Sequence, residues 1–508
     1  MTASSKRAVT SEKGVVAAQH PAAAEAGIRM LAAGGNAVDA AIAATLAVGI
    51  AEPWLSGLGG GGLMLVRLAS ERKTHGIDFS MVSPRRLDVA RYPLATGTDA
   101  GLFQWPRVEG DRNVSGPESI CVPGTVAGLG LAAEHFALLP WPTLITPAIE
   151  LAEAGLPVDW FTRLTIGVEI GLDVNPATRS VFLPDGKPPE ADAGHRLVNP
   201  TLTATLRRLA AAGPRDFYEG EIARRIVDDL AAYGSVLDHD DLKSYRASIV
   251  EPVSIDYRGT RVETMPGLTG GPTYLAAMKS LSSDIAPEVA PSPETFVAYA
   301  RALAAATADR LATHGHAGLT HDPGCTSHVS VIDADGNMAS LTSTLLARFG
   351  SKLILPATGL LMNNGMMWFD PRPGTPNAIA AGKRPLANMC PLLGTRGGEP
   401  SFVMGAAGGR QIVPALVQLT SFLFDFRMPV EEAIRMPRLD ASTSTMICDD
   451  RMAPAHVAAI ARSFPVSRAA DTVYPVQFGV PNVVLRKDGL NKGMAHTTTP
   501  WPVALAES

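Results

Sequence analysis

The chain has little cysteine. Four cysteines occur among its 508 residues, and they lie far apart at positions Cys121, Cys325, Cys390 and Cys448. No Cys-x-x-Cys pair is present, and the thiols are too few and too scattered for a disulfide framework or a zinc site. We therefore expect no metal centre, and this use of cysteine fits a reducing compartment.

The sequence also lacks basic runs and long apolar runs. No stretch of five Lys or Arg residues occurs and the formal net charge is −5, which gives no footprint for nucleic acid or an anionic membrane. No uncharged apolar run reaches the roughly 18 residues of a membrane span. The nearest, residues 40–51, stops at Glu52 and Pro53 and is expected to be a buried helix. The opening MTASSKRAVTSEKG has no apolar core of an export signal, so a cytoplasmic protein is predicted.

What the sequence does contain is enough apolar material for a large core. Apolar residues make up 46% of the chain and charged residues 18%. Alanine-rich helices are predicted in the first two-thirds, with Asn36 capping a helix that runs to about residue 50. Strands are expected to concentrate in the last third, which favours a layered α+β body over a doubly wound sheet.

Several individual elements are predicted from local patterns. Asp335 and Gly336 lie between two alternating apolar segments and indicate a hairpin. The other expected elements are a helix at 219–233, strand, turn and strand at 256–265, a helix at 293–315, a helix near 411–426 and a strand pair around 477–488.

The strongest candidate for chemistry is the cluster Gly324-Cys325-Thr326-Ser327-His328, which directly precedes a predicted strand. A threonine hydroxyl is a poor nucleophile without an adjacent base. If the peptide bond before Thr326 is broken, the new α-amine, with a pKa of about 8, supplies that base on the same residue. Taken by itself, the cluster also fits a turn that enters a strand, where Ser and Thr are common.

Longer stretches of the sequence favour the chemical interpretation. They are, in chain order, GVVAAQHPAAAEAGIRMLAAGGNAVDAAIAATLAVGIAEPWLSGLGGGG at 14–62, PGTVAGL at 123–129, FYEGEIA at 217–223, DYRG at 256–259, TSHVSVIDADGN at 326–337, KRPL at 383–386 and GAAGG at 405–409. Together they resemble the gamma-glutamyltransferases, a family of N-terminal-nucleophile hydrolases, over about residues 14–490. The stretch at 326–337 resembles the start of that family's small subunit.

The resemblance implies roles for individual residues. Thr326 matches the family's nucleophile, which also cleaves its own precursor, so the bond between Cys325 and Thr326 is the expected cleavage site. Thr344 matches a threonine that is hydrogen-bonded to the nucleophile. Gly408 and Gly409 match the glycine pair whose backbone N–H groups form the oxyanion hole.

Three neighbours of the nucleophile offer alternatives. Cys325 would serve if cleavage fell one residue earlier, since related amidases use an N-terminal cysteine. Ser327 matches a position that is commonly hydroxylated but secondary in the family. His328 could suggest a histidine-based triad, although it matches a family histidine that is not the general base.

The substrate-binding positions depart from the family's pattern. In gamma-glutamyltransferases an Arg and an Asp hold the α-carboxylate and α-amine of glutamate, aided by an Asn, a Gln or Glu and two serines. Gap-free counting places other residues there, namely Val89, Leu346, Gly365, Trp368, Ala387 and Asn388. A glutamate zwitterion buried without its partners would carry a desolvation penalty of several kcal/mol. A shift in register would bring Arg85, Arg86 or Arg91 to the arginine position.

Other polar side chains are candidates for binding a substrate. Asn388 supplies one amide, and Arg348 and Arg384 are cations that could meet a substrate carboxylate. Lys352 and Arg410 lie nearby in the sequence and could do the same. Each cation fits surface charge or a structural ion pair equally well.

The sequence therefore predicts an autoprocessed amidohydrolase with the four-layer αββα sandwich that the resemblance implies. Residues 1–325 are expected to form a large subunit and residues 326–508 a small subunit, interleaved in one body. The expected substrate is a small-molecule amide with a compact acyl group, of oxamate or acylase type. No metal or organic cofactor is expected, and a homo-oligomer is left open. The segment between Arg310 and Thr326 is only fifteen residues long, shorter than usual in the family, which bears on self-cleavage.

Two other functions remain open at this point. The first alternative is a true gamma-glutamyl hydrolase or transferase that acts on glutathione-type substrates. The second is an uncleaved, non-catalytic homologue that acts as a binding protein.

Overall fold

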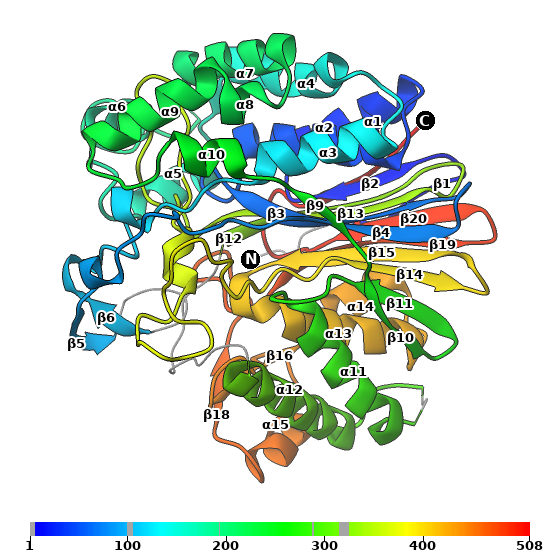
Figure 1. Ribbon diagram of the computed structural model, residues 1–508. Helices are drawn as coiled ribbons and strands as arrows, with labels where there is room; N and C mark the ends of the chain where they lie inside the picture. The colour runs from blue at the N-terminus through cyan, green and yellow to red at the C-terminus, as the bar shows by residue number, and fades with distance from the viewer. Residues whose placement is uncertain (1–5, 99–104, 193, 287–288, 314–324) are drawn as a thin grey trace.

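The computed structural model describes residues 6–98, 105–192, 194–286, 289–313 and 325–508. Within these ranges two seven-stranded antiparallel sheets lie face to face, and helices cover both outer faces (Figure 1). This arrangement confirms the predicted α+β class and the four-layer αββα sandwich. No helix in the described ranges combines the length and the apolar character needed to cross a membrane.

Both sheets take strands from either side of residue 325. The first sheet has the order β1 (Val9–Ser11), β20 (Leu490–Ala495), β19 (Val480–Lys487), β15 (Glu399–Ala407), β14 (Leu392–Arg396), β11 (Thr260–Thr264) and β10 (Val253–Tyr257). The second sheet has the order β21 (Val503–Ala506), β2 (Val15–Ala18), β12 (Cys325–Ile332), β13 (Met338–Leu346), β3 (Gly61–Leu68), β4 (Lys73–Phe79) and β9 (Ser248–Val250). The two parts of the chain are thus interleaved in each sheet.

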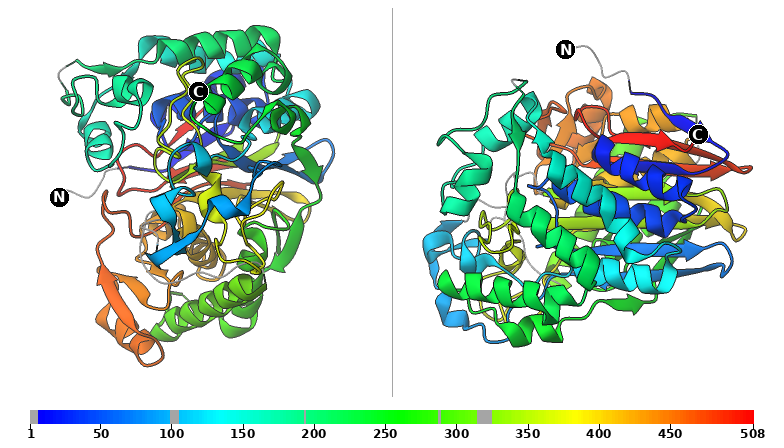
Figure 2. Two further views of the ribbon diagram at one scale, coloured as in Figure 1. Left: turned by 60° about the vertical axis from the view of Figure 1, so that its left-hand side comes forward. Right: turned by 90° about the horizontal axis from the view of Figure 1, so that it is seen from above.

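The helices form the two outer layers. Over the second sheet lie α1 (Pro21–Ala32), α2 (Ala37–Ala51), α3 (Thr125–Phe136), α4 (Trp141–Ala154), α7 (Pro200–Ala212), α8 (Asp216–Glu219), α9 (Glu221–Ala232) and α10 (His239–Ser244), with α5 (Trp160–Gly167) and α6 (Pro176–Phe182) at one end (Figures 1 and 2). Over the first sheet lie α11 (Gly271–Asp284), α12 (Pro293–Thr313), α13 (Ile412–Phe424), α14 (Val430–Arg435) and α15 (Pro454–Ala461). Small sheets pair β5 (Leu94–Thr98) with β6 (Pro106–Val108), β7 (Leu156–Pro157) with β8 (Arg196–Leu197), and β17 (Met446–Asp449) with β16 (Leu439–Asp440) and β18 (Val466–Ala469).

The central strands are buried on both faces, and their sequences show why. In β3, Leu63 and Leu65 pack between the two sheets, whereas Met64 and Val66 pack beneath the helices. Because successive side chains of a strand point to opposite faces, a strand with two buried faces reads as a continuous apolar run. The segment LMLV is such a run, so the core of the sandwich gives no alternating pattern here.

The predicted buried helix is α2, and its cap is confirmed. The Asn36 side chain accepts hydrogen bonds from the backbone N–H groups of Val38 (2.8 Å) and Asp39 (3.2 Å). The Asp39 carboxylate in turn accepts a hydrogen bond from the backbone N–H of Asn36. Every residue of α2 except Ile50 is buried. The helix is apolar all round because it lies between the second sheet and α4.

Most predicted elements are confirmed, with two corrections. The hairpin at Asp335 and Gly336 joins β12 to β13, and β10 and β11 form the predicted strand pair. The last strand pair was placed too early, because the turn lies at Asp488 and Gly489 and β20 extends to Ala495. Strands are denser after residue 325, as predicted, but the division is incomplete because β1 to β4 also come from short segments near the start of the chain.

Candidate active site

Thr326 lies at the start of β12, at one edge of the second sheet, and is 4% exposed. The pairing with β13 is irregular here: Ser327 lies opposite Ser343, but Cys325 lies opposite Leu346. Two residues of β13, Thr344 and its neighbour, therefore face Thr326 across a β-bulge. The bulge brings Thr326 next to Thr344, the residue that the resemblance pairs with it.

The alternation along β12 separates Thr326 from Ser327. The Ser327 hydroxyl accepts a hydrogen bond from Ser56 (3.2 Å), which follows α2 in the helical layer. The His328 ring lies on the opposite face against Gly405 of the other sheet, where a Cβ on that glycine would be 2.2 Å from the ring. Thr326 shares the face of His328 and therefore points toward the first sheet.

Gly408 and Gly409 lie at the same edge of the sandwich as Thr326. Ser340, which pairs with Ser330 of β12, donates to the backbone oxygen of Met404 at 3.2 Å, and one residue further along β15 Gly405 meets His328. The two strands therefore run in opposite directions. The end of β15, where Gly408 and Gly409 follow, is next to the start of β12.

The glycine pair begins a helical segment with an unusual backbone. Gly408 has φ +124° and Gly409 φ +53°, both in the region that favours glycine. Gly408 precedes the 3-10 turn η5 (Gly409–Gln411), Gly409 is its first residue, and α13 follows. N–H groups at such a start have no acceptor within the helix and sit at the positive end of its dipole. A developing oxyanion is the kind of group that this position stabilises.

The glycine-rich run after Ser56 lets the backbone approach β13 closely. A Cβ at Gly60 would lie 2.3 Å from the backbone oxygen of Thr344, and a Cβ at Gly59 would lie 2.3 Å from that of Leu361. The Thr344 hydroxyl accepts a hydrogen bond from the backbone N–H of Leu346 at 2.8 Å. Leu346 has φ +88°, an uncommon conformation for a side-chain residue, so strained backbone borders the bulge.

His328 is placed as a structural residue. Its Nδ1 is 2.8 Å from the Thr342 hydroxyl and its Nε2 is 3.1 Å from the Ser330 hydroxyl. Complete burial lowers the pKa of this imidazole to about 3, so it is neutral at physiological pH. Both ring nitrogens are engaged, which argues against a histidine-based triad.

An open cavity begins beside the glycine pair, at Arg410, with about 550 Å³ of space between atoms, its open mouth included. Trp105, Trp368, Arg310 and Asn388 also line it. Three of the positions singled out in the sequence, Leu346, Trp368 and Ala387, pack in one apolar cluster with Trp105, and a Cβ at Gly365 would meet the thiol of Cys121 at 2.8 Å.

The side-chain amide of Asn388 has one hydrogen-bonded atom and one atom without a partner among the described residues. Its Oδ1 accepts from the Arg310 guanidinium at 3.3 Å, whereas its Nδ2 is buried and has no hydrogen-bond partner among the described residues. Arg310 also donates to the backbone oxygens of Thr269 (2.5 Å) and Ala387. The lining of the cavity thus includes an amide donor that is fixed and unsatisfied.

Arg310 lines the cavity, although the sequence did not single it out as a binding residue. Burial lowers the pKa of its guanidinium to about 10, so it stays charged at neutral pH. Its hydrogen-bond acceptors among the described residues are backbone oxygens, the Thr273 hydroxyl and the Asn388 amide oxygen, and not a carboxylate. An arginine within the alanine-rich helix α12 was the available signal.

The other predicted cations are engaged elsewhere. Arg384 forms an ion pair with Asp78, and the Arg348 guanidinium stacks over the ring of Tyr474 at 5.3 Å. Lys352 pairs with Glu169 at 2.9 Å. None of the three is among the described residues that line the Asn388 cavity, whereas Arg410 is.

The three arginines that a shift in register would bring to the clamp position do not line the cavity. Arg86 forms an ion pair with Asp238 (3.2 Å), Arg91 pairs with Glu118 (2.5 Å), and Arg85 is exposed. Val89 is 41% exposed. In the described part of the chain these residues therefore supply no carboxylate clamp to the cavity.

The side chains of Asn363 and Asn364 join the backbone segments around the site by hydrogen bonds, and the sequence did not single them out either. Asn363 Nδ2 donates to the backbone oxygens of Gly59 (2.7 Å) and Cys121 (2.9 Å), which ties the glycine-rich run to the loop before α3. Asn364 Oδ1 accepts from the backbone N–H of Ala347 at 3.0 Å, at the end of β13. The Asn-Asn-Gly sequence gives no sign of this, because it is typical of an ordinary turn.

Two features of the predicted cleavage site lie outside the described residues. They are the side chain of Cys325 and most of the short segment before Thr326, residues 314–324. Over the described residues, no three His, Cys, Asp or Glu side chains gather as metal ligands would.

Glu52, at the end of α2, predicts a pH-dependent stability. It is 4% exposed, and burial raises the pKa of its carboxyl from 4.5 to about 8. Between pH 5 and pH 7 the unfolded chain ionises this group while the folded chain keeps it protonated, so stability falls as the pH rises. Between these pH values the free energy of unfolding of Glu52→Gln should therefore rise relative to that of the parent protein. The expected rise is roughly 1.4 kcal/mol per pH unit, about 3 kcal/mol in all. Urea unfolding of both proteins at the two pH values measures this. An identical pH dependence would show that Glu52 ionises as it does in the unfolded chain.

Comparisons with known proteins agree with this geometry. The gamma-glutamyltranspeptidase family profile matches residues 23–316 and 301–486 of the chain. The Acylase ACY 1 proenzyme of Pseudomonas sp. (strain SE83) is 33% identical over 96% of this chain and 93% of its own length. Glutathione hydrolase 3 of Arabidopsis thaliana is 31% identical over 85% of this chain and 73% of its own length. The crystal structure of cephalosporin acylase from Bacillus halodurans aligns with a TM-score of 0.85 at 24% identity, over 99% of this chain and 97% of that one, and has the same fold.

Proposed function

Because this chain belongs to the gamma-glutamyltranspeptidase family, we propose that it is an amidohydrolase whose nucleophile is Thr326, freed as an amino terminus by self-cleavage. Cleavage between residues 325 and 326 gives a large subunit, 1–325, and a small subunit, 326–508. The position of Thr326 in the bulge beside Thr344, facing the end of β15, supports this assignment. The name proenzyme carried by its acylase relatives supports the maturation.

The reaction follows from the groups at this edge of the sandwich. The Thr326 hydroxyl transfers its proton to the α-amine, and Oγ attacks the amide carbonyl. The oxyanion accepts hydrogen bonds from the N–H groups of Gly408 and Gly409. The C–N bond then breaks as the ammonium returns the proton to the leaving amine. Water hydrolyses the resulting ester by the same path and regenerates Thr326.

The cavity beside Gly409 supports a compact acyl group that carries a carboxylate but no α-amine. Two arginines, Arg310 and Arg410, line it, and no acidic side chain of the described residues does. A substrate ammonium would be desolvated there without a partner, whereas a carboxylate would meet the Arg310 guanidinium and the Asn388 amide. This charge pattern is the observation that carries the substrate proposal.

A matched pair of substrates tests the specificity. Glutaryl p-nitroanilide and gamma-glutamyl p-nitroanilide differ only in the α-amine, so their kcat/KM ratio isolates the missing ammonium partners. We expect the glutaryl compound to be preferred by at least about tenfold, since a buried unpaired charge costs more than 1.4 kcal/mol. Butanoyl p-nitroanilide lacks both the α-amine and the carboxylate. It should be a poorer substrate than glutaryl p-nitroanilide. Equal or better turnover of the gamma-glutamyl compound by fully cleaved enzyme would contradict the proposal.

That contrary result would favour a gamma-glutamyl hydrolase that acts on glutathione-type substrates, and the relative from Arabidopsis thaliana is named a glutathione hydrolase. A chain that stays intact after long incubation would instead favour a non-catalytic binding protein. The same preparation, examined by gel electrophoresis and by the substrate pair, separates the three functions.

A further inference from the structure

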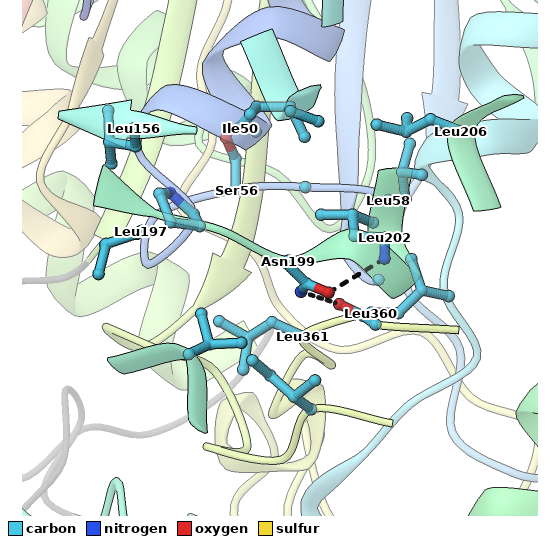
Figure 3. Close-up of a pocket in the computed structure, with 18 of the residues that line it drawn as sticks. Ile50, Ser56, Leu58, Leu156, Leu197, Asn199, Leu202, Leu206, Leu360 and Leu361 are labelled. Atoms are coloured by element: carbon cyan, nitrogen blue, oxygen red, sulfur yellow. Dashed lines mark hydrogen bonds between the residues drawn. The ribbon is translucent and has the colours of Figure 1, made fainter. Parts of the chain in front are cut away.

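A second cavity lies in the helical layer, and Ser56, which bonds Ser327 of β12, is one of the residues that line it (Figure 3). It encloses about 860 Å³ of space between atoms, its open mouth included. Its walls come from α2, α7, the glycine-rich run after α2 and the loop at 354–361. Most of the wall is aliphatic, and the labelled side chains of Ile50, Leu58, Leu197, Leu202 and Leu206 surround the space in Figure 3.

The polar atoms of this wall fall into two groups. Asn199 is satisfied, because its Oδ1 accepts from the backbone N–H of Leu202 (3.0 Å) and its Nδ2 donates to the backbone oxygen of Gly359 (2.9 Å). Ser56 donates to Ser327. Thr45 and Thr125 are 3% and 2% exposed, and neither hydroxyl has a hydrogen-bond partner among the described residues.

Two unpaired hydroxyls in an aliphatic wall need an explanation, because each buried hydroxyl without a partner costs about 1–3 kcal/mol. A ligand oxygen that bonded them would remove that cost. The lining has no Asp, Glu, Lys, Arg or His among the described residues, so a charged head group would be desolvated without compensation.

We infer that this cavity is a binding site for a small neutral molecule with a short aliphatic chain and one oxygen, such as an alcohol or a primary amide. The chain occupies the leucine-lined space, and the oxygen bonds the hydroxyls of Thr45 and Thr125. The site is separate from the proposed nucleophile, and its occupation does not depend on cleavage at Thr326.

Isothermal titration of the whole protein with 1-hexanol and with hexanoate tests the inference. The two probes share a chain length and differ in head-group charge. We expect saturable binding of 1-hexanol and at least about tenfold weaker binding of hexanoate. Absence of 1-hexanol binding up to its solubility limit, or equal binding of hexanoate, would overturn the proposal.

Isosteric variants locate the binding. Thr45→Val and Thr125→Val each remove an unpaired hydroxyl, so each should leave the ligand-free protein folded and about 1–3 kcal/mol more stable. Each should weaken 1-hexanol binding by about fivefold through the loss of one hydrogen bond. Thr162→Val is the matched control, because Thr162 is also fully buried with an unpaired hydroxyl but does not line the cavity. Affinities of the first two variants that equal that of Thr162→Val would refute the assigned contacts.

Discussion

Thr326→Ala is expected to remain one chain of residues 1–508 and to show no amidase activity. The methyl group cannot attack the preceding peptide bond, so the α-amine that would serve as the base is never released. The substrate reaction loses its nucleophile for the same reason. Removal of such a group from a hydrolase lowers kcat by on the order of 10⁴–10⁶.

Gel electrophoresis and amino-terminal sequencing measure the processing. The parent protein should give two chains, the smaller beginning Thr-Ser-His-Val-Ser. Thr326→Ser keeps a hydroxyl at the same position and should still be cleaved and retain part of the activity. Ser327→Ala should be cleaved as well, because Ser327 faces Ser56 on the opposite side of the strand. A smaller chain that began with Cys325 would transfer the role of nucleophile to that cysteine.

The sequence predicted the elements that local chemistry determines. Asn36 had the spacing of a cap, Asp335 and Gly336 had the composition of a hairpin turn, and both predictions are confirmed. The long apolar helix α2 was recognisable from composition alone. The αββα layering, in contrast, came from the resemblance, because no periodicity shows which strands pair with which.

The strands at the start of the chain show why the rest could not be predicted. β2 consists of Val15, Val16, Ala17 and Ala18 and pairs with β21, at the other end of the sequence, and with β12. All four residues are buried, so the segment has no alternation to mark it as a strand. Its structure is determined by partners hundreds of residues away, and propensity gives little information about such pairing.

The residues of the candidate site likewise include some that the sequence predicted and some that it did not. Leu346, Trp368 and Ala387, placed by counting along the sequence, do gather in one cluster with Trp105. Arg384, chosen only for its charge, has Asp78 as its partner, whereas Arg310 reaches the cavity from α12. A charge in a sequence carries no information about its partner, so only the folded chain distinguishes a substrate-binding arginine from a structural one.

The second large effect is expected at the glycine pair. Gly409→Ala should lower kcat by about 10²–10³ with little change in KM, because the N–H of residue 409 is used chiefly when the oxyanion forms. Its φ of +53° lies close to the left-handed region that an alanine can enter at about 1–2 kcal/mol, so the variant should fold. The strain and the added methyl group displace the amide from the oxyanion. Steady-state kinetics on fully cleaved enzyme, with the better of the two anilides, measures the loss.

Gly397→Ala provides a control for backbone strain. Gly397 has φ +59°, lies in the turn between β14 and β15, and has open space around the position of a Cβ. It is at the opposite end of β15 from Gly409, so the same substitution imposes similar strain far from Thr326. We expect this variant to lose stability comparably and to keep its kcat. If both alanine variants turned over substrate at rates within about twofold of each other, Gly409 would not be an oxyanion donor. A fall in kcat for Gly409→Ala alone would separate the loss of the donor from the cost of the conformation.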